Sequence, residues 1–304
     1  MRGYQAIRSI LKTGTSDMYT ANEYYKKTFG HKMYKAAISL DVTCPNRDGT
    51  KGTGGCIFCS GSGEFAAKGK DITHQIDDAI GRVKHKAGDD AGYIAYFQSY
   101  TNTYCDPGYL RNALSEAASH PKIEGLSVAT RPDCLPDTIL EVLKDTASKI
   151  PLFVELGLQT SSDKTAALIN RGYETSIYPE AVRNLKQSGA NVITHVIIGL
   201  PGETRTDMEE TVRLVSSSGS DGIKFTCLFV LEGTKLADMY RKGEFSVLGM
   251  EEYFDIVFDL VKILPDNMVV HRLTGDGPKS TLIAPDWTRN KRAVLNYMNR
   301  RFGL

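Results

Sequence analysis

The chain has 304 residues, of which 41% are hydrophobic and 24% charged, and its net charge at pH 7 is +1. This length allows one or two domains with a large core, and the balanced charge excludes a protein that attracts nucleic acid through its overall field. Residues 1–19 lack the apolar core of a signal peptide, and no apolar run is long enough to cross a bilayer. We therefore expect a cytoplasmic protein with no membrane partner.

The predicted elements alternate between strands and helices along the chain. Short apolar runs predict strands, and amphipathic periodicity predicts helices. In chain order we expect a strand at 36–42, a helix at 71–86, a strand at 92–98, a helix at 107–119, a strand at 125–130, a helix at 136–149, a strand at 152–158, helices at 162–170 and 176–188, and strands at 191–198 and 222–229. The alternation predicts βαβ units and a parallel sheet, either doubly wound or closed toward a barrel.

A loop after the first predicted strand contains three of the six cysteines, Cys44, Cys56 and Cys59. Without a secretory context, cysteines crowded in this way indicate a metal site rather than disulfides. A closed zinc site needs four ligands, and simple iron–sulfur carriers also use four thiolates. Three thiolates would leave one iron of a cubane cluster open for chemistry. The alternative is a zinc knuckle that a distant His or Cys completes.

The carboxyl ends of the other predicted strands are polar or rich in glycine. In both parallel folds, functional residues lie in the loops at these ends. The sequence there reads FQSYTN at 97–102, TRPD at 130–133, GLQT at 157–160, GLPG at 199–202 and LEGT at 231–234. The pattern predicts one convergent site at this edge of the sheet.

A strand followed by three cysteines, with Phe58 just before the last one, resembles the radical S-adenosylmethionine (SAM) superfamily. The spacing C-x11-C-x2-C has a longer first gap than the common C-x3-C-x2-C, as in the subgroup of the Elongator catalytic subunit. The whole chain resembles a bacterial group related to that subunit but without its acetyltransferase domain. The resemblance implies a partial (β/α)6 TIM-like barrel at 36–235, an N-terminal extension at 1–35 and a C-terminal helical extension at 236–304 that packs on the barrel.

The resemblance also implies the cofactors, a [4Fe–4S] cluster and SAM, and an electron donor such as flavodoxin or ferredoxin. The reduced cluster would cleave SAM to a 5′-deoxyadenosyl radical, which takes a hydrogen atom from the substrate, while the protein aligns the three partners and excludes water. Residues that could face the substrate follow the second strand, with structural packing as the alternative for each: Tyr100, Asn102, Tyr104 and Cys105. The cysteines outside the loop do not form a second CxxC cluster, which argues against the sulfur-inserting members.

Two motifs carry the most specific implied contacts with SAM. VELGLQT and NRGY resemble a segment of the Elongator subunit and of the oxygen-independent coproporphyrinogen oxidases, in which the matching Gln159 and Arg171 contact SAM. The guanidinium of Arg171 would pair with the SAM carboxylate through its planar fork, and an ordinary surface ion pair is the alternative.

The remaining implied SAM contacts are weaker. HVIIGLPGET places His195 where relatives often have an Asp near the ribose, and a satisfied core histidine is the alternative. Ala129 stands where relatives place a Glu, so Thr130 or Arg131 would have to substitute for it. The other expected contacts are Phe58, Gln98, Ser99 and Glu155.

The last predicted helix, after Trp287, concentrates positive charge that could contact RNA, with a solvated helix face as the alternative. Its basic residues are Arg289, Lys291, Arg292, Arg300 and Arg301. Some members of the resembled bacterial group are linked to tRNA, in which they convert a carboxymethylaminomethyl group at C5 of the wobble uridine to an aminomethyl group. We expect this function for the chain. The alternatives are a radical SAM enzyme that acts on a small molecule, such as a porphyrinogen, and a non-catalytic iron–sulfur or zinc module that binds nucleic acid.

Overall fold

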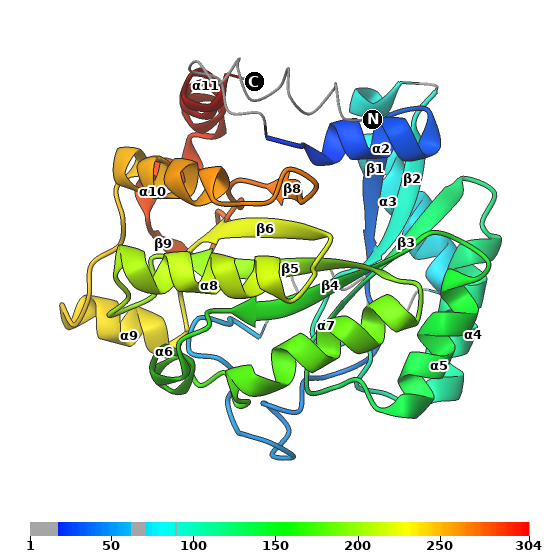
Figure 1. Ribbon diagram of the computed structural model, residues 1–304, viewed down its shortest axis with the longest axis horizontal. Helices are drawn as coiled ribbons and strands as arrows, with labels where there is room; N and C mark the ends of the chain where they lie inside the picture. The colour runs from blue at the N-terminus through cyan, green and yellow to red at the C-terminus, as the bar shows by residue number, and fades with distance from the viewer. Residues whose placement is uncertain (1–17, 62–70, 89, 304) are drawn as a thin grey trace.

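The computed structural model describes residues 18–61, 71–88 and 90–303. Its centre is a seven-stranded sheet in the order β1-β2-β3-β4-β5-β6-β8, in which every pair of neighbours is parallel (Figure 1). The strands are β1 Met33–Ile38, β2 Gly92–Phe97, β3 Ile123–Thr130, β4 Leu152–Gln159, β5 Asn191–Ile198, β6 Gly222–Cys227 and β8 Val269–Arg272. The sheet curls into a half-barrel, so the predicted partial TIM-like barrel is confirmed, with one strand more than predicted.

Helices cover the outer face of the sheet, and strand and helix residues there form the main core. The helices are α2 Ala21–Phe29, α3 Ile72–Ala87, α4 Pro107–Ser119, α5 Asp137–Ala147, α6 Asp163–Leu168, α7 Tyr178–Gln187, α8 Arg205–Ser217, α9 Lys235–Arg241, α10 Met250–Lys262 and α11 Lys291–Phe302. Local sequence fixes several helix starts, since the side chains of Asp71, Asp106 and Thr204 each accept a hydrogen bond from a backbone N–H of the first turn.

Two short strands and two short 3₁₀ helices complete the described elements. The strands β7 Val230–Leu231 and β9 Leu282–Ala284 form a separate antiparallel pair, and the 3₁₀ helices are η1 Thr175–Ile177 and η2 Asp286–Arg289. No helix in the described ranges combines the length and the apolar character that a membrane crossing requires.

The first strand differs from its prediction. It begins at Met33 and ends at Ile38, whereas the apolar run predicted a strand at 36–42. After Ile38 the side chain of Gln75 on α3 replaces a neighbouring strand: its Oε1 accepts from the Ser39 backbone N–H at 2.8 Å, and its Nε2 donates to the Ser39 carbonyl at 3.1 Å. Because Gln75 pairs with both backbone groups of Ser39, the strand ends at Ile38 and the cysteine loop follows. The strand therefore includes residues that we assigned to the N-terminal extension.

The strand of the main sheet that the sequence did not predict is β8, which lies in the predicted C-terminal helical extension. It has only four residues, VVHR, and pairs with β6 at one edge of the sheet. The extension thus contributes a strand to the barrel as well as helices α10 and α11. The division into a barrel and two extensions stays a prediction.

Helix α2 closes the amino-terminal end of the barrel and contacts both edge strands, β1 and β8. Its Tyr25 packs in a buried cluster with the first inward-facing residues of the strands, among them Ile94, Phe153 and Ile193. Just before α2, the carbonyl of Tyr19 accepts a hydrogen bond from the Val270 backbone N–H of β8 at 2.8 Å. The barrel interior therefore has an apolar floor and opens toward the carboxyl ends of the strands.

Candidate functional site

The cysteine loop folds around two of its own side chains, Asn46 and Arg47. Asn46 donates through Nδ2 to the carbonyl of Asn170 at 2.5 Å and lies 3.8 Å from the sulfur of Cys56, while Arg47 donates to the carbonyl of Cys59 at 2.8 Å. A Cβ at Gly61 would lie 2.4 Å from the Arg47 guanidinium, and the φ of Gly61 is +69°. Glycine suits this position because a side chain at this positive φ would be strained, and a Cβ would also displace the end of the Arg47 side chain.

The three cysteines line a cavity of about 440 Å³ that enters the barrel interior. The predicted contact residues Phe58, Gln98, Ser99, Thr130, Glu155, Gln159, Arg171 and His195 line the same cavity. In the described part of the chain, no three His, Cys, Asp or Glu side chains converge closely enough to hold a single metal ion. Three thiols spread along one cavity wall, flanked by glycines, suit a larger group such as an iron–sulfur cluster better than one zinc ion.

The thiols lie in a partly charged environment. Burial raises the pKa of Cys56 to about 11, so this side chain is a thiol at neutral pH and must lose its proton before it can bind iron. Arg131 directs Nη1 toward the sulfur of Cys44 at 3.9 Å, and its other nitrogens pair with both oxygens of Asp133 at 2.9 Å. Burial opposes the charge of Arg131, but Asp133 outweighs burial and raises the pKa of the guanidinium. Arg131 therefore supplies a permanent positive charge beside the cysteine wall.

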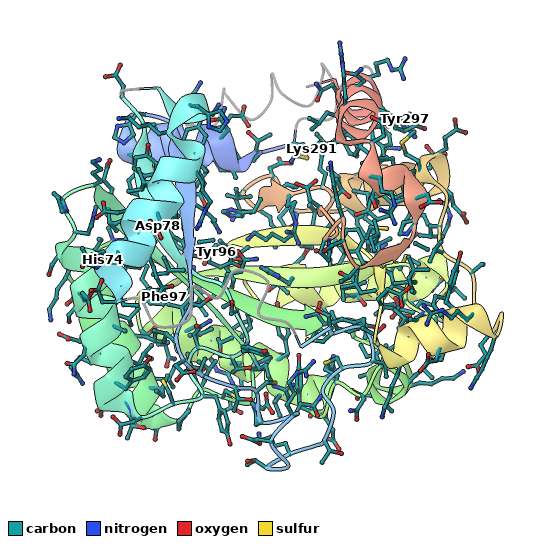
Figure 2. The ribbon with its side chains drawn as sticks, turned by 180° about the vertical axis from the view of Figure 1, so that it is seen from behind. His74, Asp78, Tyr96, Phe97, Lys291 and Tyr297 are labelled. Atoms are coloured by element: carbon teal, nitrogen blue, oxygen red, sulfur yellow. The ribbon has the colours of Figure 1, made fainter. Side chains whose placement is uncertain are left out.

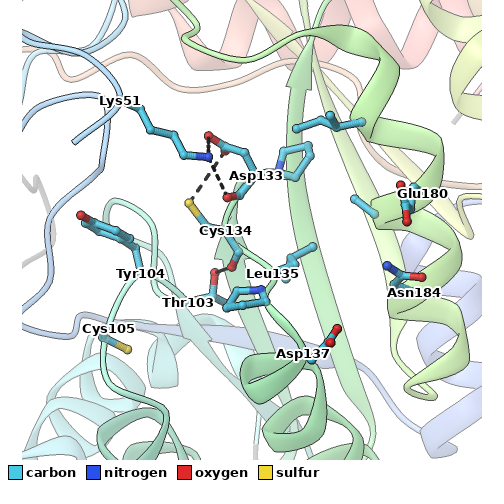
Figure 3. Close-up of a pocket in the computed structure, with 14 residues that line it drawn as sticks. Lys51, Thr103, Tyr104, Cys105, Asp133, Cys134, Leu135, Asp137, Glu180 and Asn184 are labelled. Carbon is cyan, nitrogen blue, oxygen red and sulfur yellow. Dashed lines mark hydrogen bonds and ion pairs between the residues drawn. The ribbon is translucent and has the colours of Figure 1, made fainter. Parts of the chain in front are cut away.

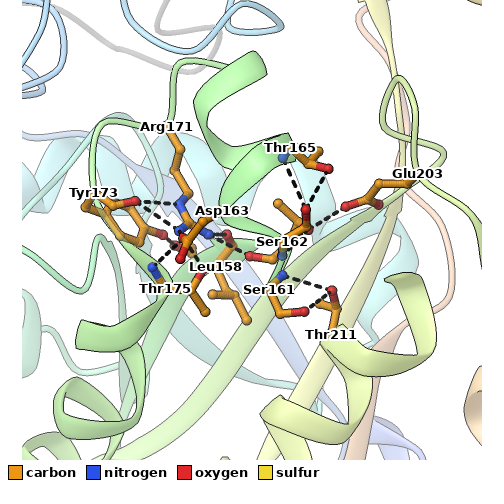
Figure 4. Close-up of polar contacts among 12 residues, drawn as sticks. Leu158, Ser161, Ser162, Asp163, Thr165, Arg171, Tyr173, Thr175, Glu203 and Thr211 are labelled. Atoms are coloured by element: carbon orange, nitrogen blue, oxygen red, sulfur yellow. Dashed lines mark hydrogen bonds and ion pairs between the residues drawn. The ribbon is translucent and has the colours of Figure 1, made fainter. Parts of the chain in front are cut away.

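Arg171 is 1% exposed, and its donors are occupied by the protein (Figure 4). Nη1 donates to the carbonyls of Leu158 and Thr160 at 3.0 and 2.6 Å, and Nε donates to the carbonyl of Tyr173 at 3.2 Å. Nη2 donates to the Tyr173 carbonyl and to Oγ1 of Thr175, at 3.0 and 2.9 Å. The guanidinium thus ties the end of β4 to the segment before η1. Its predicted pairing with the SAM carboxylate stays a prediction.

Three residues have a left-handed backbone although they are not glycine: Tyr100 and Gln159, which line the cavity, and Asn170, with φ of +58°, +70° and +53°. Such backbones cost energy and concentrate at functional sites. Gln159 also marks the point where the pairing of β4 with β5 shifts by one residue. Two of the three positions are anchored by their side chains: Tyr100 donates to the carbonyl of Gly61, and Asn170 donates to the carbonyl of Gly55 at 2.8 Å.

The predicted SAM contacts Ser99, Thr130 and His195 already have protein partners. Ser99 shares a 2.7 Å hydrogen bond with Ser39, and Thr130 bonds to Thr103. Nε2 of His195 lies 2.7 Å from Oε2 of Glu155, an arrangement that matches the alternative of a satisfied core histidine, although the ring also lines the cavity.

Glu155, expected to contact the cofactor, is the centre of a buried ion cluster that the sequence did not predict. Its carboxylate is fully buried and pairs with Lys35 and Lys224, and it accepts a hydrogen bond from Ser127 at 2.9 Å. Burial raises the pKa of Glu155, but the two lysines outweigh burial and hold it well below its usual range. The available signal was Lys224 at an inward position of the apolar strand GIKFTC.

The cluster makes stability depend on pH. Burial lowers the pKa of His195 from 6.5 to about 4, so between these values the unfolded chain binds a proton that the folded chain does not. The free energy of unfolding should therefore fall as the pH drops through this window, by up to about 1.4 kcal/mol per unit for this residue. Denaturant titrations at several pH values between 4 and 6.5 measure this dependence. The slope of the free energy of unfolding against pH should be shallower for His195→Gln than for the original chain, and the exposed His85→Gln is the control. Equal slopes in all three proteins would contradict this account.

The residues expected to face the substrate divide between two places. Tyr100 lines the cavity, and Asn102 is fully buried, with Nδ2 donating to the carbonyls of Phe97 and Ala129 at 2.9 and 3.0 Å. Tyr104 and Cys105 line a different groove of about 840 Å³, beside Lys51 and Asp133 (Figure 3). None of the three loop cysteines lines that groove, so the structure does not bring Tyr104 and Cys105 to the cavity.

The basic residues of the carboxyl-terminal helix are mostly paired. Lys291 lies 2.6 Å from Asp276, Arg301 lies 3.0 Å from Asp255, and Arg289 lies 3.2 Å from Asp286. Within the described ranges, no ion pair involves the exposed Arg292 and Arg300. Helix α11, with Lys291 and Tyr297 labelled, lies at the top of Figure 2, and the cysteine loop lies toward the bottom. The predicted RNA strip is therefore largely neutralised and lies at the end of the molecule away from the cysteine loop.

Comparison with known proteins identifies the family. The model described as "Radical SAM superfamily" matches residues 46–215, and the "Radical_SAM C-terminal domain" matches residues 220–302. YtqA of Bacillus subtilis is 42% identical over 285 residues, which cover 93% of this chain and 88% of the relative. YhcC of Escherichia coli is 34% identical over 282 residues, which cover 90% of this chain and 88% of the relative.

More distant relatives share the radical SAM region. The tRNA uridine(34) acetyltransferase of Methanocaldococcus infernus is 28% identical over 174 residues, which cover 56% of this chain and 32% of that protein. The solved structure of Elp3 from the same archaeon, with an N-terminal deletion, has the same fold, with a TM-score of 0.66 at 18% identity over 88% of this chain and 63% of that one. Enzymes of the superfamily use a [4Fe–4S] cluster and SAM, and the three cysteines at the cavity fit that cluster. The chain belongs to the radical SAM superfamily and is a radical SAM enzyme related to YtqA, YhcC and the radical SAM region of Elp3.

Proposed function

We propose that this enzyme modifies tRNA at the C5 side chain of the wobble uridine and converts carboxymethylaminomethyl to aminomethyl. The observation that carries the proposal is one cavity that joins the cysteine wall to a buried layer of positive charge, where a side chain that ends in a carboxylate could be held. The names of two relatives support it: they are described as tRNA uridine(34) acetyltransferase and, in Drosophila melanogaster, Elongator complex protein 3.

In this proposal Cys44, Cys56 and Cys59 hold the cluster as thiolates. When bound, the cluster and SAM would supply a 5′-deoxyadenosyl radical that removes a hydrogen atom from the CH2 next to the substrate carboxylate. Loss of one electron from the substrate radical to the oxidised cluster and addition of water would then break the C–N bond and release the carboxymethyl group as glyoxylate. The chain's own residues set the geometry: Gln159 lies on the strained end of β4, and Arg171 fixes the loop that follows. The apolar floor, which α2 covers, keeps water from entering the cavity at the amino-terminal end of the barrel. A reductant such as flavodoxin or ferredoxin and a cytoplasmic location belong to the proposal as well.

The test is anaerobic. The enzyme is reconstituted with iron and sulfide, given SAM and a strong reductant, and assayed for 5′-deoxyadenosine with and without tRNA that carries the carboxymethylaminomethyl group. We expect this tRNA to increase 5′-deoxyadenosine formation and to gain aminomethyl uridine. Formation that is indifferent to tRNA would favour a small-molecule substrate. A well-loaded cluster that never cleaves SAM would favour the non-catalytic binding module.

The basic helix allows a separate prediction about tRNA binding. Arg292 and Arg300 have no ion pair in the described ranges, so they are the residues of α11 best able to meet phosphates. Replacing both with Gln should weaken tRNA binding and lower the slope of log affinity against log salt by about 2, as expected for two lost phosphate contacts. The control is Arg111→Gln with Lys149→Gln, which removes two exposed charges paired to Asp145. Equal tRNA affinity and salt dependence in both double variants would show that tRNA binds to another surface.

A further inference from the structure

The barrel interior contains a layer of charged side chains next to its apolar floor, one inward-facing position further toward the carboxyl ends of the strands. Lys35 of β1, Glu155 of β4 and Lys224 of β6 meet there, and Lys224 and Arg272 are register partners on neighbouring strands. The ring of Tyr96 lies beneath both lysines, with Nζ 4.4 Å from the ring centroid for Lys35 and 5.1 Å for Lys224. Alternation along the strands places Lys35, Glu155 and Lys224 on the inward face, and the register shift at His271 brings Arg272 to the same face.

Positive charge is in excess in this layer. Three basic side chains, Lys35, Lys224 and Arg272, face a single carboxylate, that of Glu155. Burial lowers the pKa of Lys224 well below its usual range, and Lys35 and Arg272 lower it further, despite the attraction of Glu155. A buried site with uncompensated positive charge is costly, and an anion that enters it relieves the cost.

Arg272 is the basic residue of the layer that lines the cavity. Its Nη2 donates to Oγ1 of Thr226, whereas its Nε is buried and has no hydrogen-bond partner within the described structure. The same cavity is lined by the three cysteines at its other end and by Tyr96, Glu155 and His195 near Arg272. A buried guanidinium donor without an acceptor is rare in proteins, and a ligand is one way to satisfy it.

We infer that Arg272 binds the terminal carboxylate of the substrate side chain at the inner end of the cavity. The floor beneath this layer is closed by α2 and the apolar cluster of Tyr25, so a ligand must end there. An internal phosphodiester of an RNA backbone continues on both sides and does not fit a dead end. The planar fork of a guanidinium matches a carboxylate, whose negative charge would offset part of the excess positive charge of the layer.

The inference rests on the proposed function for the identity of the side chain, since a carboxymethylaminomethyl group ends in a carboxylate. The carbon atoms next to that carboxylate would then lie between Arg272 and the cysteine wall, where the reactive radical forms. Arg272 is a substrate-binding residue in this account, and the lysine pair sets the charge around it. The arrangement would select side chains that are acidic over neutral side chains of the same length.

The test uses the cofactor-loaded enzyme and a small probe, N-acetylglycine, compared with its methyl ester. We expect N-acetylglycine to raise the melting temperature of the original enzyme and the ester to have no effect. Arg272→Gln should weaken N-acetylglycine binding by about 10- to 100-fold, as for a lost charge-assisted hydrogen bond, without changing SAM affinity or cluster absorbance. Arg272→Lys should retain part of the binding because it keeps the charge. The exposed Arg213→Gln on α8 is the control.

The outcomes separate this inference from the proposed function. If N-acetylglycine and its methyl ester change the melting temperature of the original enzyme equally, the inference of a carboxylate subsite is wrong, whether or not tRNA is modified. Tighter binding of inorganic phosphate than of N-acetylglycine, or a loss of SAM affinity in Arg272→Gln that matches the loss of the probe, also overturns it. If N-acetylglycine binds in an Arg272-dependent way while tRNA carrying the carboxymethylaminomethyl group is not modified, the proposed function fails and the carboxylate subsite stands.

Discussion

Cys56→Ala should leave the enzyme without its brown cluster and reduce 5′-deoxyadenosine formation more than about 100-fold, a loss larger than that caused by removing residues that only support a metal ligand. The reason is that the loop offers three thiols at one cavity wall, with no fourth cysteine among the residues that line it. Iron content, visible absorbance and 5′-deoxyadenosine are measured after the same anaerobic reconstitution.

Cys105→Ser is the matched control for this variant. Cys105 is also partly buried, but it lines the separate groove and donates to the carbonyl of Asn102 at 3.3 Å. We expect its cluster and activity to be retained. A Cys56→Ala protein that still holds a full cluster would show that the cysteine loop is not the cluster site.

Arg171→Ala should destabilise the protein even before any cofactor is added. The substitution removes the donors to the carbonyls of Leu158, Thr160 and Tyr173, of which that of Leu158 still accepts from the Thr160 backbone N–H at 2.9 Å. Each of the two carbonyls that lose their partner costs about 1 to 3 kcal/mol, so we expect a total loss of about 2 to 6 kcal/mol in the free energy of unfolding. Denaturant titration of protein purified without reconstitution measures this loss where no SAM contact can contribute.

The exposed Arg213→Ala on α8 should change the same free energy by no more than about 0.5 kcal/mol. A direct contact between Arg171 and the SAM carboxylate predicts a different result: weak SAM binding by a variant whose cofactor-free stability is normal. That result would support the role that the family resemblance implies for Arg171, the pairing with the SAM carboxylate.

The sequence predicted an element accurately where local interactions define it, and inaccurately where contacts between distant residues define it. Helix α4 and strand β5 match their predicted bounds because local signals define them: Asp106 and Pro107 start the helix, and a continuous apolar run makes up the strand. Strand β1 was misplaced because its end depends on Gln75, which lies 36 residues from Ser39. Strand β8 was missed because four residues carry too little pattern to be recognised.

The same distinction holds at the site. The cysteine spacing and the polar strand ends predicted which residues line the cavity, because parallel strands bring their carboxyl ends together. The partners of those residues were not predictable from the sequence, since Glu155 meets Lys35 across 120 positions and Lys224 across 69. The occupied donors of Arg171 could not be predicted for another reason: three of its partners are backbone carbonyls, which every residue type has.

Helix α2 has a consequence for how the protein is made. The floor of the cavity joins α2 to β8, whose residues 269–272 are translated about 240 residues after α2. The nascent chain can form the cysteine loop and its neighbouring strands while synthesis continues, because those contacts need only the first two-thirds of the sequence. The contacts with β8 close a loop of more than 200 residues, and such long-range contacts form slowly. The inner end of the cavity, with Arg272, can therefore be completed only after β8 has been synthesised.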